Sequence, residues 1–335
     1  MKAVVLEEPG KALVKDVRDP IASHDVLLRV RMVGLCGSDL NSYRGRDPLV
    51  SFPRIPGHEI AATVVDAGSQ AEWHPGTNVT LSPYMNCGEC ASCLRGRPNA
   101  CQFNETLGVQ RDGALMELIR VPATKLHRAN LTLKELCLVE PLTVGFHAVM
   151  RGRVTDGDTV AVLGCGGVGL GAVAGAAFRG AKVIGVDVDD AKLETARKAG
   201  ATHQINTGQG DLHKRLAELT NGHGPDVVIE AIGLPETYRA AVEEVAYTGR
   251  VVYIGWSKEH VTYETRSFVH KELDILGSRN ALPENFRDVI RMLEAHRFPV
   301  EDAVTQVVSI DETPKILESW SREPARFTKI IVEVG

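Results

Sequence analysis

The stretch TVAVLGCGGVGLGAVAGAA, residues 159–177, decides the fold of half the chain. A short apolar run rich in valine precedes Gly164, Gly166 and Gly169, and a run of helix-forming residues follows them. That order of strand, glycine loop and helix makes the G-x-G-x-x-G spacing a strong indication of a dinucleotide-binding fold. The first glycine permits the tight turn, the second lets a pyrophosphate approach the backbone, and the third lets the helix pack closely against the strand.

The residues around this loop predict NAD as the dinucleotide. Asp187 closes the next predicted strand, at the place where a carboxylate accepts hydrogen bonds from the ribose hydroxyls of NAD. A 2′-phosphate would meet that negative charge, and no arginine follows in VDVDDAK to neutralise it. We expect Gly167 and Val168 to start the helix whose N–H groups face the phosphates, and Lys192 to reach the ribose or a phosphate.

An alternation of apolar strands and helical segments begins near Val154 and predicts a parallel sheet covered by helices on both faces. Strands are predicted at residues 159–164, 182–187, 203–206, 226–231, 250–255 and 273–278. Helices are predicted at residues 168–181, 190–201, 235–246 and 283–298, followed by a turn region and a closing strand at 327–334. At the carboxyl ends of the strands we expect the cofactor path to be lined by Ile232, Tyr253, Ile254, Gly255, Ser278 and Arg279. For Arg279, hydrogen bonding between domains is an equally good alternative.

Length and composition indicate two domains in a soluble cytoplasmic protein. The 335 residues exceed what one hydrophobic core usually supports, and 44% of them are apolar. A net charge of -5 and a pI near 6.1 give no reason to expect nucleic acid as a partner. No apolar run reaches signal-peptide or membrane-spanning length, so we expect no membrane association. In a reducing compartment the seven cysteines favour metal binding or burial over disulfides.

Four of the seven cysteines lie in the stretch CGECASCLRGRPNAC, residues 87–101. Cys87, Cys90, Cys93 and Cys101 offer four thiolates at a spacing that suits one tetrahedral zinc ion. A closed shell of four thiolates leaves no position for water or substrate, so this zinc is predicted to be structural. It would hold together a loop-rich lobe, at about residues 84–104, that has few apolar residues of its own.

A second set of zinc-type ligands is scattered through the first half of the chain. Cys36 opens CGSD, His58 and Glu59 lie in GHE, and Glu140 lies in VEPL. Each has an ordinary alternative, as a buried cysteine, a core histidine or a helix-capping carboxylate. Together they offer a thiolate, an imidazole and carboxylates, which leave zinc one exchangeable position, as catalysis requires.

The motifs CGSD, GHE, the four-cysteine lobe, VEPL, GCGGVG and GSRN occur in the order found in zinc-dependent medium-chain alcohol dehydrogenases, which essentially the whole chain resembles. The resemblance implies an α/β fold, with a Rossmann doubly wound parallel sheet and a β-rich, GroES-like catalytic domain that carries the zinc lobe. We expect the catalytic domain at residues 1–149, the NAD-binding domain at 150–280 and a return to the catalytic domain at 281–335. With Glu140 in its VEP segment, the chain resembles the polyol (sorbitol-type) and threonine dehydrogenase branch of the family. Classical alcohol dehydrogenases have a cysteine at that position.

The resemblance also implies how the catalytic zinc is held. Two zinc ions per subunit are expected, with Cys36 and His58 binding the catalytic one and Glu59 or Glu140 in contact with it directly or through water. Spacing does not decide between the two carboxylates. We expect Glu59 to be the more frequent direct ligand, and Glu140 to alternate with it or to bind the zinc-bound water.

Hydride transfer from an alcohol to NAD is the predicted reaction. Zinc strongly lowers the pKa of a bound hydroxyl, so that a secondary alcohol can lose its proton and deliver hydride to the nicotinamide. By the resemblance, the Ser38 hydroxyl connects the substrate oxygen with the nicotinamide ribose. Many relatives have a histidine three residues after this serine, where the chain has Asn41, and an amide is no base near neutral pH. We therefore predict that the proton leaves through ordered water, past Tyr43.

The polar segment SDLNSYRGRDPLVSFPR, residues 38–54, favours a polyhydroxylated small-molecule substrate, and its arginines make a sugar acid an option. The leading hypothesis is an NAD-dependent dehydrogenase that oxidises a secondary hydroxyl of a polyol or sugar acid. L-Threonine 3-dehydrogenase or simple alcohol dehydrogenase is the alternative within the family, and a zinc- and nucleotide-binding regulatory protein is the alternative that is not an enzyme. The apolar strand in RVVYIGW and the resemblance together suggest a homodimer or homotetramer.

Overall fold

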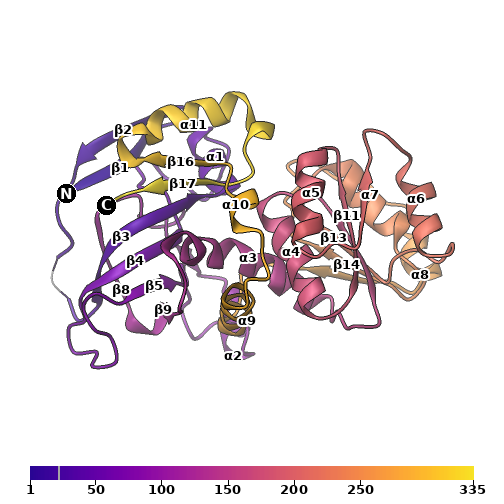
Figure 1. Cartoon of the computed structure of the whole chain (residues 1–335), viewed down its shortest axis with the longest axis horizontal. Helices are drawn as coiled ribbons and strands as arrows, with labels where there is room; N and C mark the ends of the chain where they lie inside the picture. The colour runs from indigo at the N-terminus through magenta and orange to yellow at the C-terminus, as the bar shows by residue number, and fades with distance from the viewer. Residues whose placement is uncertain (22) are drawn as a thin grey trace. The chain divides into compact units, whose positions relative to one another are not determined.

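The computed structural model describes residues 1–21 and 23–335, and it contains two compact units (Figure 1). Unit 1 is formed by Met1–Glu140 together with Val300–Gly335, and unit 2 by Pro141–Pro299. Within the described ranges, no helix is both long enough and apolar enough to cross a membrane.

The limits of the two units differ from the expected domain boundaries at 149/150 and 280/281. Along the chain, the two units meet between Glu140 and Pro141, and helix α3 (Leu133–Arg151) runs through this limit without a break. Helix α9 (Pro283–Glu294), which was expected to return to the first domain, belongs to unit 2. It is fastened there because the buried Asn285 lies 3.1 Å from Nδ1 of His147 on α3.

Unit 2 is built on a six-stranded sheet in which every pairing is parallel. The strand order is β12, β11, β10, β13, β14, β15. In that order the strands span His203–Asn206, Lys182–Asp187, Thr159–Leu163, Val227–Glu230, Arg250–Tyr253 and Asp274–Gly277. The strands predicted for this half of the chain are thus confirmed, with their ends within about two residues.

The strand order reverses at β10, the strand that leads into the glycine loop. From β10 the chain builds β11 and β12 on one side, and then β13, β14 and β15 on the other. Because parallel crossovers are right-handed, the connecting helices on the two sides of β10 lie on opposite faces of the sheet. These helices are α4 (Gly167–Phe178), α5 (Asp190–Lys198), α6 (Leu212–Leu219), α7 (Pro235–Glu244) and α8 (Arg266–His270). The carboxyl ends of the strands beside the reversal are the usual place for a nucleotide.

The strand that was expected to favour self-association does not lie at an edge of the sheet. β14, which contains the RVVY of RVVYIGW, is paired with β13 on one side and with β15 on the other. Its backbone is therefore fully used within unit 2. Trp256, just beyond this strand, is 70% exposed. A homodimer or homotetramer stays a proposal, without support from β14.

Unit 1 is built on a seven-stranded, mostly antiparallel sheet. Its order is β16, β17, β3, β4, β5, β9, with β8 also paired to β3. In that order, with β8 last, the strands span Gln306–Ser309, Ile330–Glu333, Val26–Leu35, Glu59–Asp66, Asn78–Leu81, Leu126–Arg128 and Leu118–Val121. The closing strand β17 pairs with β3, so the end of the chain completes the sheet begun by its first third.

Short elements complete unit 1. Two small antiparallel sheets are formed by β1 (Lys2–Glu8) with β2 (Lys11–Asp16), and by β6 (Tyr84–Met85) with β7 (Glu105–Thr106). The helices are α1 (Gly37–Tyr43), α2 (Ala91–Leu94), α10 (Val300–Ala303) and α11 (Thr313–Arg322).

Several helices were not anticipated from the sequence, and two regions show the physical reason. The region expected to be a turn before the closing strand contains α10, β16 and the amphipathic helix α11, which buries Leu317 and Trp320 one turn apart. Helix α3 was also missed, since Pro141 lies inside it and proline normally ends a helix. In both cases burial of an apolar face outweighs weak local signals.

Candidate functional site

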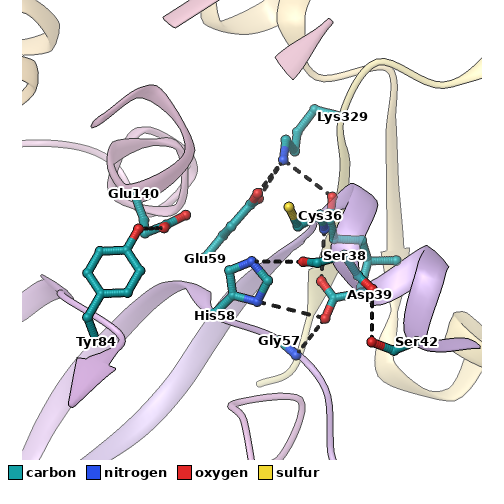
Figure 2. A network of polar contacts seen from close by, with 11 residues as sticks. Cys36, Ser38, Asp39, Ser42, Gly57, His58, Glu59, Tyr84, Glu140 and Lys329 are labelled. Carbon is teal, nitrogen blue, oxygen red and sulfur yellow. Dashed lines mark hydrogen bonds and ion pairs between the residues drawn. The ribbon is translucent and has the colours of Figure 1, made fainter. Parts of the chain in front are cut away.

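The scattered ligands Cys36, His58 and Glu59 come together in unit 1 (Figure 2). One ligand atom of each lies within 4.8 Å of the others. Cys36 follows β3 and caps α1, while His58 and Glu59 lead into β4. Antiparallel pairing sets Glu59 opposite Gly34, where a Cβ would meet Glu59 Oε2 at 2.0 Å, so only glycine leaves room for this carboxylate. A thiolate, an imidazole and a carboxylate at this spacing fit a zinc ion with one position left open.

Asp39 organises this cluster, although the sequence analysis did not single it out. Its two oxygens accept the N–H groups of Cys36 at 2.9 Å and of Gly57 at 3.1 Å. Its Oδ1 also lies 3.8 Å from His58 Nδ1, a buried atom with no hydrogen-bond partner in the part of the chain that the structure describes. Burial acts to lower the pKa of His58, but the negative charges of Asp39 and Cys36 outweigh burial and hold that pKa well above its usual value.

This excess of negative charge is what a metal cation would neutralise, and a carboxylate is the common partner of a metal-binding imidazole. The signal for Asp39 was present in CGSD. It stands at the third position of a helix, where an acidic side chain commonly caps the first turn.

Glu59 has a buried cationic partner, Lys329, which the sequence analysis missed. Lys329 Nζ lies 2.6 Å from both Glu59 oxygens and donates to Leu35 O at 3.3 Å. The pairing of β17 with β3 brings it there, because Ile330 stands opposite Leu35. Burial acts to lower the pKa of Lys329, but Glu59 and Cys36 keep it above its usual value, so the ammonium stays charged.

Glu140 lies near the cluster but is not among the three residues whose ligand atoms converge. It projects from α3, and its Oε1 accepts a short hydrogen bond from the Tyr84 hydroxyl on β6 (Figure 2). Burial raises the pKa of Glu140 to about 7, against the opposing effect of His58 and with a further rise from Glu59. Burial and the Glu140 charge also raise the pKa of Tyr84 well above its usual value, so the phenol keeps its proton.

Ser38 lies beside the imidazole, whereas Tyr43 faces other residues. Ser38 Oγ is 3.5 Å from His58 Nε2 (Figure 2). Tyr43 ends α1 and packs in the core of unit 1. Burial raises the pKa of Tyr43. Of the charged residues of α11, Glu318 raises this pKa further and Arg322 lowers it. The structure therefore gives no support to a proton path past Tyr43.

Two of the three arginines in segment 38–54 are engaged by protein partners. Arg44 Nε donates to Ser321 Oγ at 3.0 Å, and a second guanidinium nitrogen donates to the Ser321 carbonyl. Arg54 pairs with Asp112 at 3.1 Å and donates to Ser51 Oγ at 2.9 Å. This corrects the expectation that these side chains are available to bind a substrate carboxylate. For these two arginines, nearness to Cys36 in the sequence does not make them available to a substrate there.

The lobe cysteines Cys87, Cys90, Cys93 and Cys101 form the second cluster, with all four sulfurs within 4.8 Å of one another. The Sγ–Sγ distance is 3.6 Å for the pairs 90–93 and 87–101, and 3.8 Å for 90–101. Four sulfurs that each lie about 2.3 Å from one zinc ion are about 3.8 Å apart in a tetrahedron. The lobe therefore fits a structural zinc.

The three glycines of the nucleotide loop meet different needs. Gly164 has φ +95°, which glycine adopts without strain. A Cβ on Gly169 would lie 1.8 Å from the Gly164 carbonyl oxygen, so α4 can approach the loop only without a side chain there. Gly166 is the N-cap of α4, and a Cβ on it would meet no protein atom within 4 Å. Open space at the N-terminus of this 12-residue helix fits a pyrophosphate.

Asp187 is fixed at the end of β11. One of its oxygens accepts Cys165 N–H at 2.8 Å, and the other accepts the N–H groups of Val188 at 2.8 Å and Asp189 at 3.2 Å. A carboxylate has about four acceptor sites, so capacity remains for a ribose hydroxyl. Lys192 stands half-buried in the first turn of α5, where its N–H is capped by Asp189.

Glu230 is a residue of this edge that the sequence analysis missed. It ends β13 and is fully buried, and its Oε1 accepts the N–H groups of Ile232 at 2.9 Å and Gly233 at 2.7 Å. The Thr237 hydroxyl donates to the same oxygen at 2.8 Å. Glu230 thereby fixes the loop whose Ile232 side chain lies against Gly164. An acid inside the apolar run VVIEAIG was the available signal.

The remaining expected lining residues follow β14 and β15. Tyr253 stacks on Tyr238 with a ring separation of 4.1 Å and donates its hydroxyl to the Tyr238 carbonyl at 2.9 Å. Its polar tip is therefore engaged by the protein. Ile254 and Gly255 come directly after β14, and Ser278 and Arg279 directly after β15. Contact of these residues with a cofactor stays a prediction.

Comparisons with known proteins agree with this geometry. The family model for the alcohol dehydrogenase GroES-like domain matches residues 22–130, and the model for zinc-binding dehydrogenase matches residues 167–295. An uncharacterized zinc-type alcohol dehydrogenase-like protein of Haemophilus influenzae is 36% identical, over 98% of both chains. Sorbitol dehydrogenase of Bacillus subtilis is 34% identical, over 99% of this chain and 97% of that protein. The solved structure of RspB from Escherichia coli, complexed with NADH, superposes with a TM-score of 0.90 at 28% identity, over 100% of this chain and 99% of that one.

Proposed function

The chain belongs to the zinc-type medium-chain alcohol dehydrogenase family, and from that premise we propose that it uses NAD to oxidise a secondary hydroxyl of a polyol or sugar acid to a ketone. The observation that carries the proposal is the convergence of three ligand atoms, and not four, at Cys36, His58 and Glu59. Closed four-ligand shells serve structure, and shells with an open position serve catalysis. A zinc ion bound there supplies Lewis acidity, which lowers the pKa of a coordinated hydroxyl.

We infer a separate role in the reaction for each of the residues around this centre. Cys36 and His58 would hold the metal, while Asp39 accepts the Cys36 N–H and lies 3.8 Å from Nδ1 of the imidazole. Ser38 Oγ, 3.5 Å from His58 Nε2, is placed to receive the proton of a substrate hydroxyl. Glu140 has a pKa of about 7, so its carboxylate can accept and return a proton at a working pH near neutrality.

The choice of NAD rests on Asp187. Its carboxylate is held by three backbone N–H groups at the end of β11, where it would repel a 2′-phosphate. Among similar solved structures, RspB carries NADH and a zinc-binding dehydrogenase of Sinorhizobium meliloti carries NADP, so the proposal depends on the Asp187 carboxylate. The backbone of the glycine loop would form the rest of the nucleotide site, beside the loop of Ile232 and Gly233 that the Glu230 carboxylate holds in place.

A neutral polyol is favoured over a sugar acid as the substrate. Of the three arginines in segment 38–54, two are bound by protein partners, Arg44 by Ser321 and Arg54 by Asp112, which reduces the number available to a substrate carboxylate. The relative at 34% identity is named sorbitol dehydrogenase and one at 31% identity is named L-galactonate-5-dehydrogenase, so the names of the relatives include both classes.

The decisive experiment is a turnover panel of polyols, aldonates, L-threonine and simple alcohols, each assayed with NAD and with NADP. We expect the largest kcat/KM for a secondary hydroxyl of a polyol with NAD, and we expect loss of activity on zinc removal with recovery on zinc addition. A protein that binds zinc and NAD yet oxidises no member of the panel would favour the regulatory alternative. L-Threonine as the best substrate would favour L-threonine 3-dehydrogenase, the alternative within the family.

A matched pair of variants separates cofactor binding from metal binding. Gly166→Ala places a Cβ in open space, so the protein should fold and load zinc while losing NAD affinity. Cys36→Ser should lose the catalytic metal while retaining NAD affinity, because the glycine loop and Asp187 are untouched.

A further inference from the structure

The two glutamates beside the proposed catalytic metal site are held by different partners (Figure 2). Glu59 is paired with Lys329, whose Nζ is 2.6 Å from both carboxylate oxygens. Glu140 instead accepts a hydrogen bond from the Tyr84 hydroxyl. Glu59 belongs to the group of ligand atoms within 4.8 Å of one another, and Glu140 does not. Both pairs are buried, so each partner strongly influences where its carboxylate lies.

The backbone around Glu140 is fixed, and only its side chain is adaptable. The preceding turn of α3 packs through Leu136 and Cys137 against Ala61 of β4 and Ile331 of β17. Cys137 Sγ also lies 3.3 Å from the carbonyl oxygen of Glu59. A glutamate that turns about its side-chain torsions can therefore change partners without a movement of the helix.

Tyr84 is held more firmly than the carboxylate that it binds. It lies in β6, where it pairs with Thr106 of β7, and its ring is buried. A tyrosine has only two side-chain torsions and a rigid ring, so its hydroxyl marks a fixed point. The hydrogen bond to this fixed donor sets the direction of the Glu140 carboxylate.

From this geometry we propose that Tyr84 is a positioning residue that restrains Glu140 from binding the catalytic metal and so keeps the substrate position open. The inference rests on the proposed function, because it assumes a catalytic metal at Cys36, His58 and Glu59. A buried carboxylate deprived of this donor gains most from a nearby cation, which is the strongest partner it can take. Glu140 would then supply a fourth ligand and give the closed shell that characterises structural zinc sites. Tyr84 thus protects turnover without contacting substrate.

The test is Tyr84→Phe, which removes one oxygen and keeps the ring. Metal binding is followed with cobalt(II) in the catalytic site and zinc in the cysteine lobe, since the visible absorption of cobalt(II) reports its ligands. We expect a changed cobalt spectrum, release of the metal to a chelator slowed about 10-fold, and kcat lowered about 10-fold. In the double variant Tyr84→Phe/Glu140→Gln the release rate should return to that of the wild type, because the added ligand is gone.

Glu140→Gln alone provides an independent test should Tyr84→Phe fail to fold. Because Glu140 is not a ligand in the wild type, this variant should leave the cobalt spectrum and the release rate unchanged. Release accelerated about 10-fold would show that Glu140 already binds the metal and would overturn the proposal. Tyr247→Phe is the matched control in unit 2, where the exposed hydroxyl bonds His270 at 2.9 Å, and neither readout should change.

The metal readouts separate this inference from the proposed function. If Tyr84→Phe keeps the cobalt spectrum and the release rate of the wild type, Tyr84 does not restrain Glu140 and only contributes to packing. If Tyr84→Phe changes both readouts while the wild type oxidises no alcohol in the panel, the proposed function fails and the role of Tyr84 stands.

Discussion

Removal of the Lys329 ammonium should destabilise the metal-free protein far more than the zinc-loaded protein. Lys329 and Glu59 are 6% and 0% exposed, and the nitrogen lies 2.6 Å from both carboxylate oxygens. At that distance and an effective dielectric constant of about 20, the attraction is roughly 6 kcal/mol. In the wild type, part of this attraction is offset because the buried Lys329 ammonium loses its hydration. Lys329→Met removes that desolvation penalty together with the attraction. Breaking a buried pair by deleting one partner typically costs about 3–5 kcal/mol, which is the loss we expect without metal.

Zinc should reduce that loss, because Glu59 then has a second cation to compensate its charge. Two of the three tryptophans, Trp73 and Trp320, are buried in the core of unit 1, whereas Trp256 of unit 2 is 70% exposed. Urea unfolding followed by intrinsic fluorescence therefore reports mainly on unit 1. The measurement compares the free energy of unfolding of wild type and Lys329→Met, each with and without zinc.

Lys134→Met serves as the matched control. Lys134 pairs with Glu301 at 2.8 Å, but Glu301 is 79% exposed at its side chain, and such surface pairs contribute about 0–1 kcal/mol. A loss below about 1 kcal/mol in metal-free Lys329→Met, equal to that of the control, would refute the argument that Lys329 compensates a buried charge. An equal loss with and without zinc would refute the assignment of Glu59 as a ligand.

The other predictions concern the lobe, the pH response, the glycine loop and the proton path. Cys101→Ser, at a fully buried lobe sulfur, should bind one zinc ion fewer per chain and become sensitive to proteolysis between residues 84 and 106; unchanged zinc content would contradict a structural site there. Because burial raises the pKa of Glu140 from 4.5 to about 7, the folded metal-free protein holds this proton more tightly than the unfolded chain, and stability should fall as the pH rises through that window. At 1.36 kcal/mol per pKa unit, the free energy of unfolding should fall by at most roughly 3 kcal/mol. Glu140→Gln should remove this fall, and equal free energies of unfolding of the wild type in urea at pH 5 and pH 8 would contradict the prediction. Gly169→Ala should destabilise unit 2, since its Cβ would lie 1.8 Å from the Gly164 carbonyl oxygen, whereas Gly166→Ala should unfold like the wild type and differ only in NADH affinity; similar unfolding of the two variants in urea, followed by far-ultraviolet circular dichroism, would contradict the geometry. Asn41→His should alter the pH dependence of hydride transfer, and an unchanged pH profile would exclude position 41 from the proton relay.

The sequence alone determined the features that are local along the chain. The glycine loop, the strands around it and the alternation with helices follow from periodicity and glycine spacing, and the parallel sheet of unit 2 confirms them. The four lobe cysteines lie within fifteen residues, so their gathering needs only short loops. Cys36, His58, Glu59 and Glu140 were predicted as ligands because their motifs occur in a familiar order, although their spacing along the chain does not imply contact, and the ligand atoms of the first three converge.

Only the tertiary structure decided which partner each buried charge receives. Lys329 reaches Glu59 across 270 residues because β17 pairs with β3, and Tyr84 reaches Glu140 because β6 lies beside α3. Arg44 and Arg54, near Cys36 in the sequence, turn to Ser321 and Asp112 instead. A local pattern records backbone preference and hydrophobic period, whereas the neighbours of a buried polar group depend on strand register and on which surfaces exclude water.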